Sequence, residues 1–128
     1  MQATAPWVVT WDVHEVANDY ANDHPQLLDP NQPFLDRRTA AYKAYYEHMP
    51  LRRAQRPSGS SLPLYRTIDY GALARFHMLD DRQYRDYHVC YPADGFGGGS
   101  TVGPECTARV DPARSLLGRD QEAWLARQ

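Results

Sequence analysis

The sequence predicts an α/β fold with one central strand, a β-hairpin and two main helices. An apolar, β-branched run at residues 7–11 is typical of a buried strand, and residues 62–80 alternate as a hairpin does. Residues 34–48 instead repeat apolar side chains at helical spacing. The chain has 128 residues, of which 42% are hydrophobic, and this suits one globular unit. We therefore expect a single domain over residues 1–128.

The first expected elements are the strand at 7–11 and the helix at 34–48. Three prolines between them predict a loop over residues 21–33. The apolar positions of the helix lie on one stripe, and Pro50 follows to end it. These positions are Ala41, Tyr42, Tyr45, Tyr46 and Met49. We expect this stripe to pack in the core.

The hairpin is expected to have strands at 64–68 and 73–79 around a turn at 69–71. Alternate residues of a strand point to opposite faces of the sheet. We expect His77 to lie on the outer face of the second strand. The set expected to be buried is Ala74, Phe76 and Met78.

The second main helix is expected near the end of the sequence. Asp111 can cap a helix N-terminus, and Pro112 fits its first turn. We expect this helix to run toward Gln128, with Leu117 and Trp124 among its packing contacts.

The charge balance argues against some classes of partner. A net charge of −2 provides no attractive field for a nucleic acid or an anionic membrane. No apolar run approaches the roughly 20 residues that a membrane helix needs. Residues 1–6 lack the basic and apolar regions of an export signal, so the chain as written is expected to be cytoplasmic.

Polar groups gather just beyond the expected central strand. They are Asp12, His14, Glu15, Asn18 and Asp19. Carboxylate and amide oxygens are the ligands that hard metal ions prefer, and a histidine can transfer a proton near neutral pH. The pattern therefore predicts a metal or phosphoester site, with an ordinary polar loop as the alternative.

Residues 11–20 read Trp-Asp-Val-His-Glu-Val-Ala-Asn-Asp-Tyr. This run resembles the pattern Trp-Asp-Asp-His-Glu-Val-x-Asn-Asp-Tyr of the PhoD-like alkaline phosphatases, a family of metallophosphoesterases. The resemblance continues in four further segments and covers nearly the whole chain. These segments are 34–38, 41–52, 79–85 and 117–125. Val13 departs from the pattern, because the family has its second aspartate there.

The resemblance implies hydrolysis of phosphate monoesters, and in some members of diesters, with iron and calcium ions in the site. In this sequence His14 would donate a proton to the leaving oxygen. Asp12 and Asn18 would be oxygen ligands of the metal ions. Val13 stands where a bridging carboxylate is expected, and its side chain cannot coordinate a cation.

The resembling family is mostly exported, and its members are much longer. The resemblance therefore implies a partial domain over residues 1–128: part of a metallophosphatase-like α/β sandwich, truncated at both ends. We expect a phosphate ester substrate, no nucleic acid partner, and little activity without the remainder of the domain. The alternative is a degenerate, non-catalytic paralogue that acts as a binding or structural protein.

Three other patterns leave alternatives open. Cys90 and Cys106 flank a glycine-rich stretch and would form a disulfide in an exported family, whereas two free thiols would fit a cytosolic fragment. Residues 80–85 could buttress the site or form an ion-paired turn. Three arginines in the loop after the first helix could steer a phosphate or simply be solvated. They are Arg52, Arg53 and Arg56.

Overall fold

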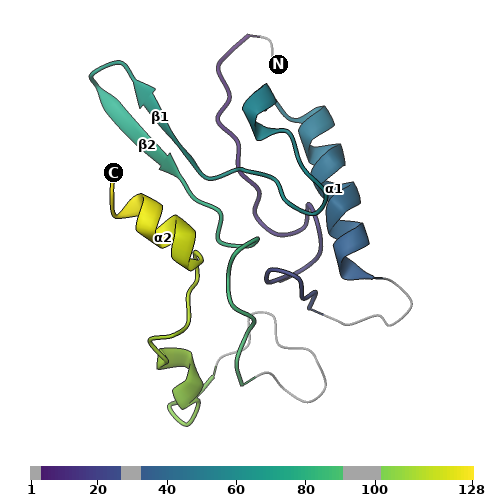
Figure 1. Ribbon diagram of the computed structural model, residues 1–128, viewed down its shortest axis with the longest axis vertical. Coiled ribbons are helices and arrows are strands. Elements are labelled where there is room, and N and C mark those ends of the chain that lie inside the picture. The colour runs from purple at the N-terminus through teal and green to yellow at the C-terminus, as the bar shows by residue number, and fades with distance from the viewer. Residues whose placement is uncertain (1–3, 27–32, 91–101) are drawn as a thin grey trace.

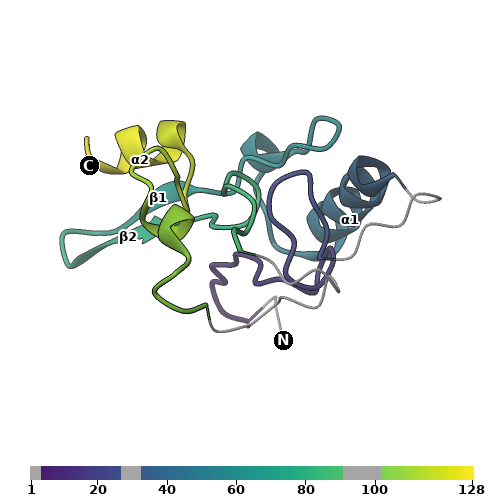
Figure 2. The same cartoon turned by 90° about the horizontal axis from the view of Figure 1, so that it is seen from below.

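The computed structural model describes residues 4–26, 33–90 and 102–128. Within these residues, two α-helices and a two-stranded antiparallel sheet are joined by loops and two short 3-10 helices. The elements, in chain order, are α1 (Phe34–His48), η1 (Arg53–Gln55), β1 (Arg66–Tyr70), β2 (Ala74–Met78), η2 (Thr107–Val110) and α2 (Arg119–Leu125). Helix α2 lies beside the hairpin, and α1 lies on the opposite side of the molecule (Figure 1, Figure 2). The mixed α/β class that the sequence predicts is confirmed.

Helix α1 has the predicted bounds, 34–48. Pro50 follows directly after its C-cap residue, and proline cannot continue a helix. Tyr42 and Tyr45 are buried, as predicted. The indole of Trp11 stacks on Tyr42 with ring centroids 4.5 Å apart and meets Tyr45 edge-on at 5.6 Å. The helix therefore holds the start of the 11–20 run through aromatic packing.

The prediction of a central strand at residues 7–11 is wrong. Within the described residues the sheet contains only β1 and β2, so this segment has no strand partner there. Its apolar pattern did reflect burial, because Val9 and Trp11 are 8% and 4% exposed. The Val9 carbonyl oxygen accepts a hydrogen bond from a side chain and not from a neighbouring strand, because Nη2 of Arg66 donates to it at 3.0 Å. A short apolar run indicates burial, but it does not reveal whether a neighbouring strand exists.

The β-hairpin is confirmed, although its bounds differ from those predicted. The first strand is Arg66–Tyr70 instead of 64–68, and the second is Ala74–Met78 instead of 73–79. The turn contains Gly71 in a left-handed conformation with φ of +54°, which glycine adopts without steric cost. The hairpin therefore turns two residues later than the sequence indicates.

The predicted burial of Phe76 is wrong, because its side chain is 50% exposed. Trp124 of α2 packs on the opposite face of the hairpin, with ring centroids 6.0 Å from His77 and 5.1 Å from Tyr65. Since α2 covers that face, Phe76 and its cross-strand partner Ile68 lie on the other one. Two other members of the predicted buried set are also partly exposed, Ala74 and Met78.

Helix α2 is shorter than predicted, because it begins at Arg119 and not near Asp111. Gly118 precedes it with φ of +78°. A Cβ at Gly118 would lie 2.7 Å from the Cβ of Tyr84, so this close approach requires glycine. The helix therefore begins only after this glycine.

The hydrophobic core lies between α1, the 9–20 segment and residues 62–64. Its buried members are Val9, Trp11, Val16, Tyr20, Tyr42, Tyr45, Leu62 and Leu64. Aromatic side chains make up half of this set, and they give a small domain a large buried apolar area. Among the helices of the described residues, none is long and apolar enough to span a membrane.

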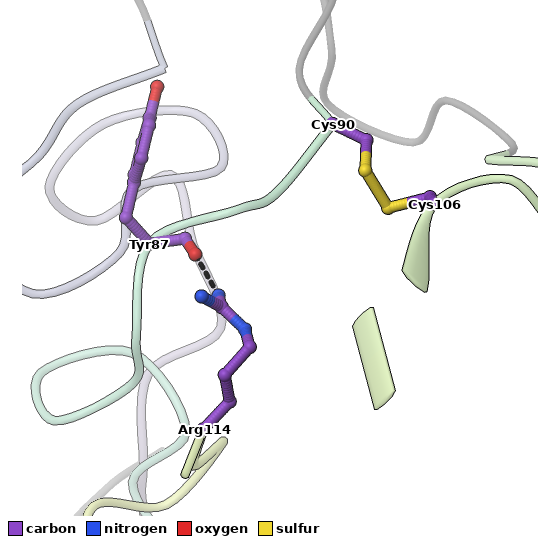
Figure 3. Close-up of a disulfide and its surroundings, with 4 residues drawn as sticks. All are labelled: Tyr87, Cys90, Cys106 and Arg114. Atoms are coloured by element: carbon purple, nitrogen blue, oxygen red, sulfur yellow. Dashed lines mark hydrogen bonds between the residues drawn. A yellow bond between two sulfur atoms is a disulfide. The ribbon is translucent and has the colours of Figure 1, made fainter. Parts of the chain in front are cut away.

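Of the two alternatives for Cys90 and Cys106, the structure has the disulfide, with Cα atoms 6.0 Å apart (Figure 3). Nearby, Arg114 donates a hydrogen bond to the backbone carbonyl of Tyr87 (Figure 3). The glycine-rich stretch between the cysteines lies mostly outside the described residues. The disulfide and the arginine together join the segment after β2 to the segment around η2.

Candidate functional site

Residues 11–20, here called the signature loop, bury three large apolar side chains and expose most of their polar ones. The buried anchors are Trp11, Val16 and Tyr20. The side chains predicted for the site are exposed, and they are Asp12, His14 and Asn18. The loop therefore presents its chemically active groups to solvent from a backbone that the core holds.

His14 and Asn18 contact each other on the outer side of the signature loop. The Nε2 atom of His14 lies 2.8 Å from Oδ1 of Asn18. The amide nitrogen of Asn18 donates in turn to Oε1 of Gln26. This second bond turns Oδ1 of Asn18 toward the imidazole, so Nε2 of His14 carries the hydrogen that is donated. The predicted proton donor is thus oriented by a predicted metal ligand.

Asp12 has an exposed carboxylate, which lies 4.0 Å from the guanidinium of Arg82, and a backbone fixed by hydrogen bonds. Its side chain is 91% exposed, while its N–H donates to the Glu15 carboxylate at 3.2 Å. The next residue, Val13, is half-buried and packs against the core. Val13, which lies in sequence between the exposed residues Asp12 and His14, therefore contributes an apolar contact to the core.

Arg82 joins the two ends of the signature loop, a role that the sequence offered only as one of two alternatives for residues 80–85. Its Nε donates to the Asp12 carbonyl oxygen at 3.0 Å, and its Nη1 lies 3.2 Å from Oδ1 of Asp19. The Arg82 side chain is only 15% exposed. Of the two alternatives for residues 80–85, the contacts favour the buttress. The mixed acidic and basic composition of that segment was the available signal.

Asp19 lies in a partly buried cluster with Arg82 and His88. Its side chain is 19% exposed, and Nε2 of His88 lies 3.2 Å from its Oδ2. The backbone of Asp19 is left-handed, with φ of +47°, which is uncommon for a residue other than glycine. Arg82 and His88 thus hold the carboxylate at the end of the signature loop.

Asp80 is a fully buried carboxyl group that connects the signature loop to the hairpin. Its Oδ1 accepts hydrogen bonds from Trp11 Nε1 at 3.1 Å and from the backbone N–H groups of Arg82 and Gln83 at 3.0 and 2.9 Å. Burial raises the pKa of Asp80, and these donors reduce the rise. Its backbone N–H and carbonyl both bond to the side chain of Gln121 in α2, at 2.8 and 2.7 Å.

The match to known proteins covers the signature loop, Arg82 and Asp80. Residues 1–128 match the family described as PhoD-like phosphatase. The chain belongs to that family. Alkaline phosphatase D of Bacillus subtilis (strain 168) is 49% identical to it over 123 residues, which are 96% of this chain and 20% of that protein. A solved structure titled "Structure of PhoD" matches 94% of this chain and 22% of its own, with a TM-score of 0.75 and 47% identity.

The chain therefore spans about a fifth of the length of the PhoD relatives it matches. The signature loop and the Arg82 buttress both lie within the matched residues. The family origin is that of a phosphoesterase, and the mixed α/β fold agrees with the matched structure.

PhoD-like phosphatases depend on metal ions, so the donor set of this chain can be compared with what a metal needs. The carboxylate of Asp12 and the amide oxygen of Asn18 suit a hard cation chemically. Across residues 4–26, 33–90 and 102–128, however, no group of three or more His, Cys, Asp or Glu could hold a metal ion. Val13 adds no donor. The described residues alone do not fit a metal ion, and they offer at most part of its ligand shell.

Proposed function

We propose that this chain is a segment of a metal-dependent alkaline phosphatase or phosphodiesterase that hydrolyses phosphate esters. The observation that carries the proposal is the signature loop, which exposes Asp12, His14 and Asn18 on a backbone fixed by Trp11 and Arg82. Exposed functional groups on a braced loop are the usual arrangement of a catalytic site. Because the ligand set is incomplete, we expect little turnover from the chain alone.

His14 is the proposed proton donor to the leaving oxygen of the ester. Its ring is exposed, and Asn18 fixes its orientation. The Asn18 oxygen keeps a second lone pair after it accepts from His14, so it could also serve as a metal ligand beside Asp12. Iron and calcium are the ions that the family resemblance implies. Their other ligands would come from the remainder of the domain.

The second candidate is a degenerate paralogue with a binding or structural role, and the observation that favours it is Val13. The family pattern has an aspartate at this position, whereas the isopropyl group of Val13 packs against the core. Loss of an anionic ligand would weaken metal binding without disturbing the fold.

A segment exchange tests the proposal. The matching segment of B. subtilis alkaline phosphatase D is replaced by this chain, and hydrolysis of a chromogenic phosphate ester is measured with iron and calcium supplied. We expect His14→Ala in this chimera to lower kcat about 100-fold or more, the usual contribution of general acid catalysis. The matched control is His48→Ala, which removes an exposed histidine at the end of α1.

Equal turnover in the His14→Ala and His48→Ala chimeras would exclude His14 as the proton donor. A folded chimera without turnover would favour the non-catalytic paralogue.

A further inference from the structure

A cavity of about 540 Å³ lies between α1 and the loop that follows it. Its volume is within the range of small-molecule sites, about 300–1,000 Å³. The helix contributes Lys43, Tyr46 and Glu47 to its wall, and the loop contributes Arg53, Arg56 and Pro57. No residue of the signature loop lines it, so it is separate from the candidate phosphoesterase site.

The cavity is positively charged, because three cationic side chains face one carboxylate. Lys43 is paired with Glu47, with Nζ 3.9 Å from Oε1. Among the described residues, the side chains of Arg53 and Arg56 have no hydrogen bond or ion pair. Two available guanidinium groups at one cavity suit an oxyanion, since each can bind phosphate oxygens through a pair of N–H groups.

The loop wall of the cavity is fastened to the rest of the molecule. Arg38 of α1 donates from Nε to the Ser60 carbonyl oxygen at 2.8 Å. Ser58 and Ser61 exchange backbone hydrogen bonds of 2.9 and 3.1 Å. Gln55, which is 6% exposed, accepts a hydrogen bond from the Arg52 N–H at 3.1 Å. A ligand would therefore enter a preformed space and would not need to order the loop.

We propose that this cavity binds a small organic phosphate, as a second site beyond the proposed phosphoesterase site. Arg53 and Arg56 hold the phosphoryl group. The ring of Tyr46 and the apolar face of Pro57 contact the organic part. The arginine-rich loop is thus a binding element and not merely a solvated turn.

Nuclear magnetic resonance of the 15N-labelled 128-residue chain tests this proposal. The probe is phenylphosphonate, whose phosphorus–carbon bond a phosphoesterase does not cleave, and inorganic phosphate is titrated in parallel. We expect phenylphosphonate to shift the Tyr46 and Gly59 amides saturably, to bind more tightly than inorganic phosphate, and to bind more weakly as sodium chloride is added.

The double variant Arg53→Gln, Arg56→Gln should weaken binding by about tenfold or more, as the loss of charged hydrogen bonds does. Thr39→Asp gives an independent check, because it adds a carboxylate to the helical wall of the cavity. It should weaken binding as well. The matched control is Arg127→Gln, an exposed arginine beyond α2 that does not line the cavity.

The proposal is overturned if the cavity amides do not shift, if shifts are confined to residues 12–18, or if Arg127→Gln weakens binding as much as the double variant. Equal affinities for phenylphosphonate and inorganic phosphate would overturn the assignment of the organic part to Tyr46 and Pro57.

Discussion

Arg82 bonds to three points of the 12–22 segment. Its guanidinium contacts the Asp12 carbonyl and the Asp19 carboxylate, and its own carbonyl accepts from the Asn22 N–H at 2.8 Å. The first two bonds belong to its side chain, which is mostly buried. The spacing of the exposed groups on the signature loop therefore depends on a residue outside it.

Arg82→Gln should destabilise the protein by about 1–3 kcal/mol, because it removes the guanidinium from the partly buried Asp19 carboxylate and leaves His88 as a remaining charged neighbour or hydrogen-bond donor. Urea unfolding measures this loss, and amide exchange should quicken over residues 12–19. Arg75→Gln is the control, since Arg75 pairs with Asp69 on the exposed hairpin. Its loss should be smaller. Equal losses in the two variants would show that Arg82 does not brace the loop.

Asp80 gives the protein a predictable dependence of stability on pH. Burial raises its pKa in the folded state, whereas in the unfolded chain an aspartate titrates near about 4. The folded state therefore binds this proton more tightly. The contribution of Asp80 to stability is fully present at acid pH and is lost as pH rises through its raised pKa.

Asp80→Asn removes this titration. As pH rises from about 3 to about 8, the urea midpoint of the parent should fall relative to that of Asp80→Asn. The quantity to compare is the difference in urea midpoint between the parent and Asp80→Asn, because other carboxyl groups titrate equally in both proteins. A difference that does not vary with pH, or that varies in the opposite direction, would contradict a raised pKa.

At the scale of elements, the disulfide stabilises the irregular segment around η2, which has little regular secondary structure of its own. Cys90 and Cys106 are separated by 16 positions. Changing both to serine should destabilise the protein by about 2–4 kcal/mol, mainly because the unfolded chain gains freedom. Amide exchange should quicken near η2 but not in α1. This account would be contradicted if the serine variant and the reduced, alkylated parent both unfolded at the same urea concentration as the oxidised parent.

The sequence predicted those elements whose signals are local. The bounds of α1 follow from a continuous apolar stripe and from Pro50. Both signals lie within one stretch of chain. The strand at 7–11 and the burial of Phe76 depended on partners elsewhere in the fold. A strand needs a second strand beside it, and the buried face of the hairpin is the one that α2 happens to cover.

The candidate site likewise contains residues that the sequence predicts locally and residues whose role depends on the fold. Asp12, His14 and Asn18 lie within seven residues and could be found from their spacing. The bond partners of Arg82 could not be found in this way, because its bond to Asp12 joins residues 70 positions apart and exists only in the folded chain. The cavity likewise could not be predicted, because it exists only where α1 and the loop after it line the same space in the folded chain.

At the scale of the whole molecule, apolar side chains remain exposed on the hairpin. Phe76 is 50% exposed, Tyr70 65% and Leu73 83%. Trp7 in the N-terminal segment is 49% exposed. Exposed apolar side chains grouped on one hairpin indicate an interaction site or an aggregation risk.

The chain should therefore bind a hydrophobic fluorescent dye while folded. The double variant Leu73→Ser, Phe76→Ser should reduce dye fluorescence more than Val110→Ser, which removes a 73% exposed valine from η2. The measurement is dye fluorescence at equal protein concentration, with circular dichroism to verify folding. Equal fluorescence for the two variants would mean that the hairpin does not present the apolar surface.

The most direct test of the whole account is Val13→Asp in the chimera with B. subtilis alkaline phosphatase D. Loss of a residue that merely supports a metal ligand costs about 10–100-fold in affinity or activity. The account therefore predicts that restoring a carboxylate between Asp12 and His14 raises turnover of a chromogenic phosphate ester by at least that factor. The gain should disappear when His14→Ala is added, and Val110→Asp should give none. A chimera that is already as active with Val13 as with aspartate would contradict the assignment of this position to the metal site.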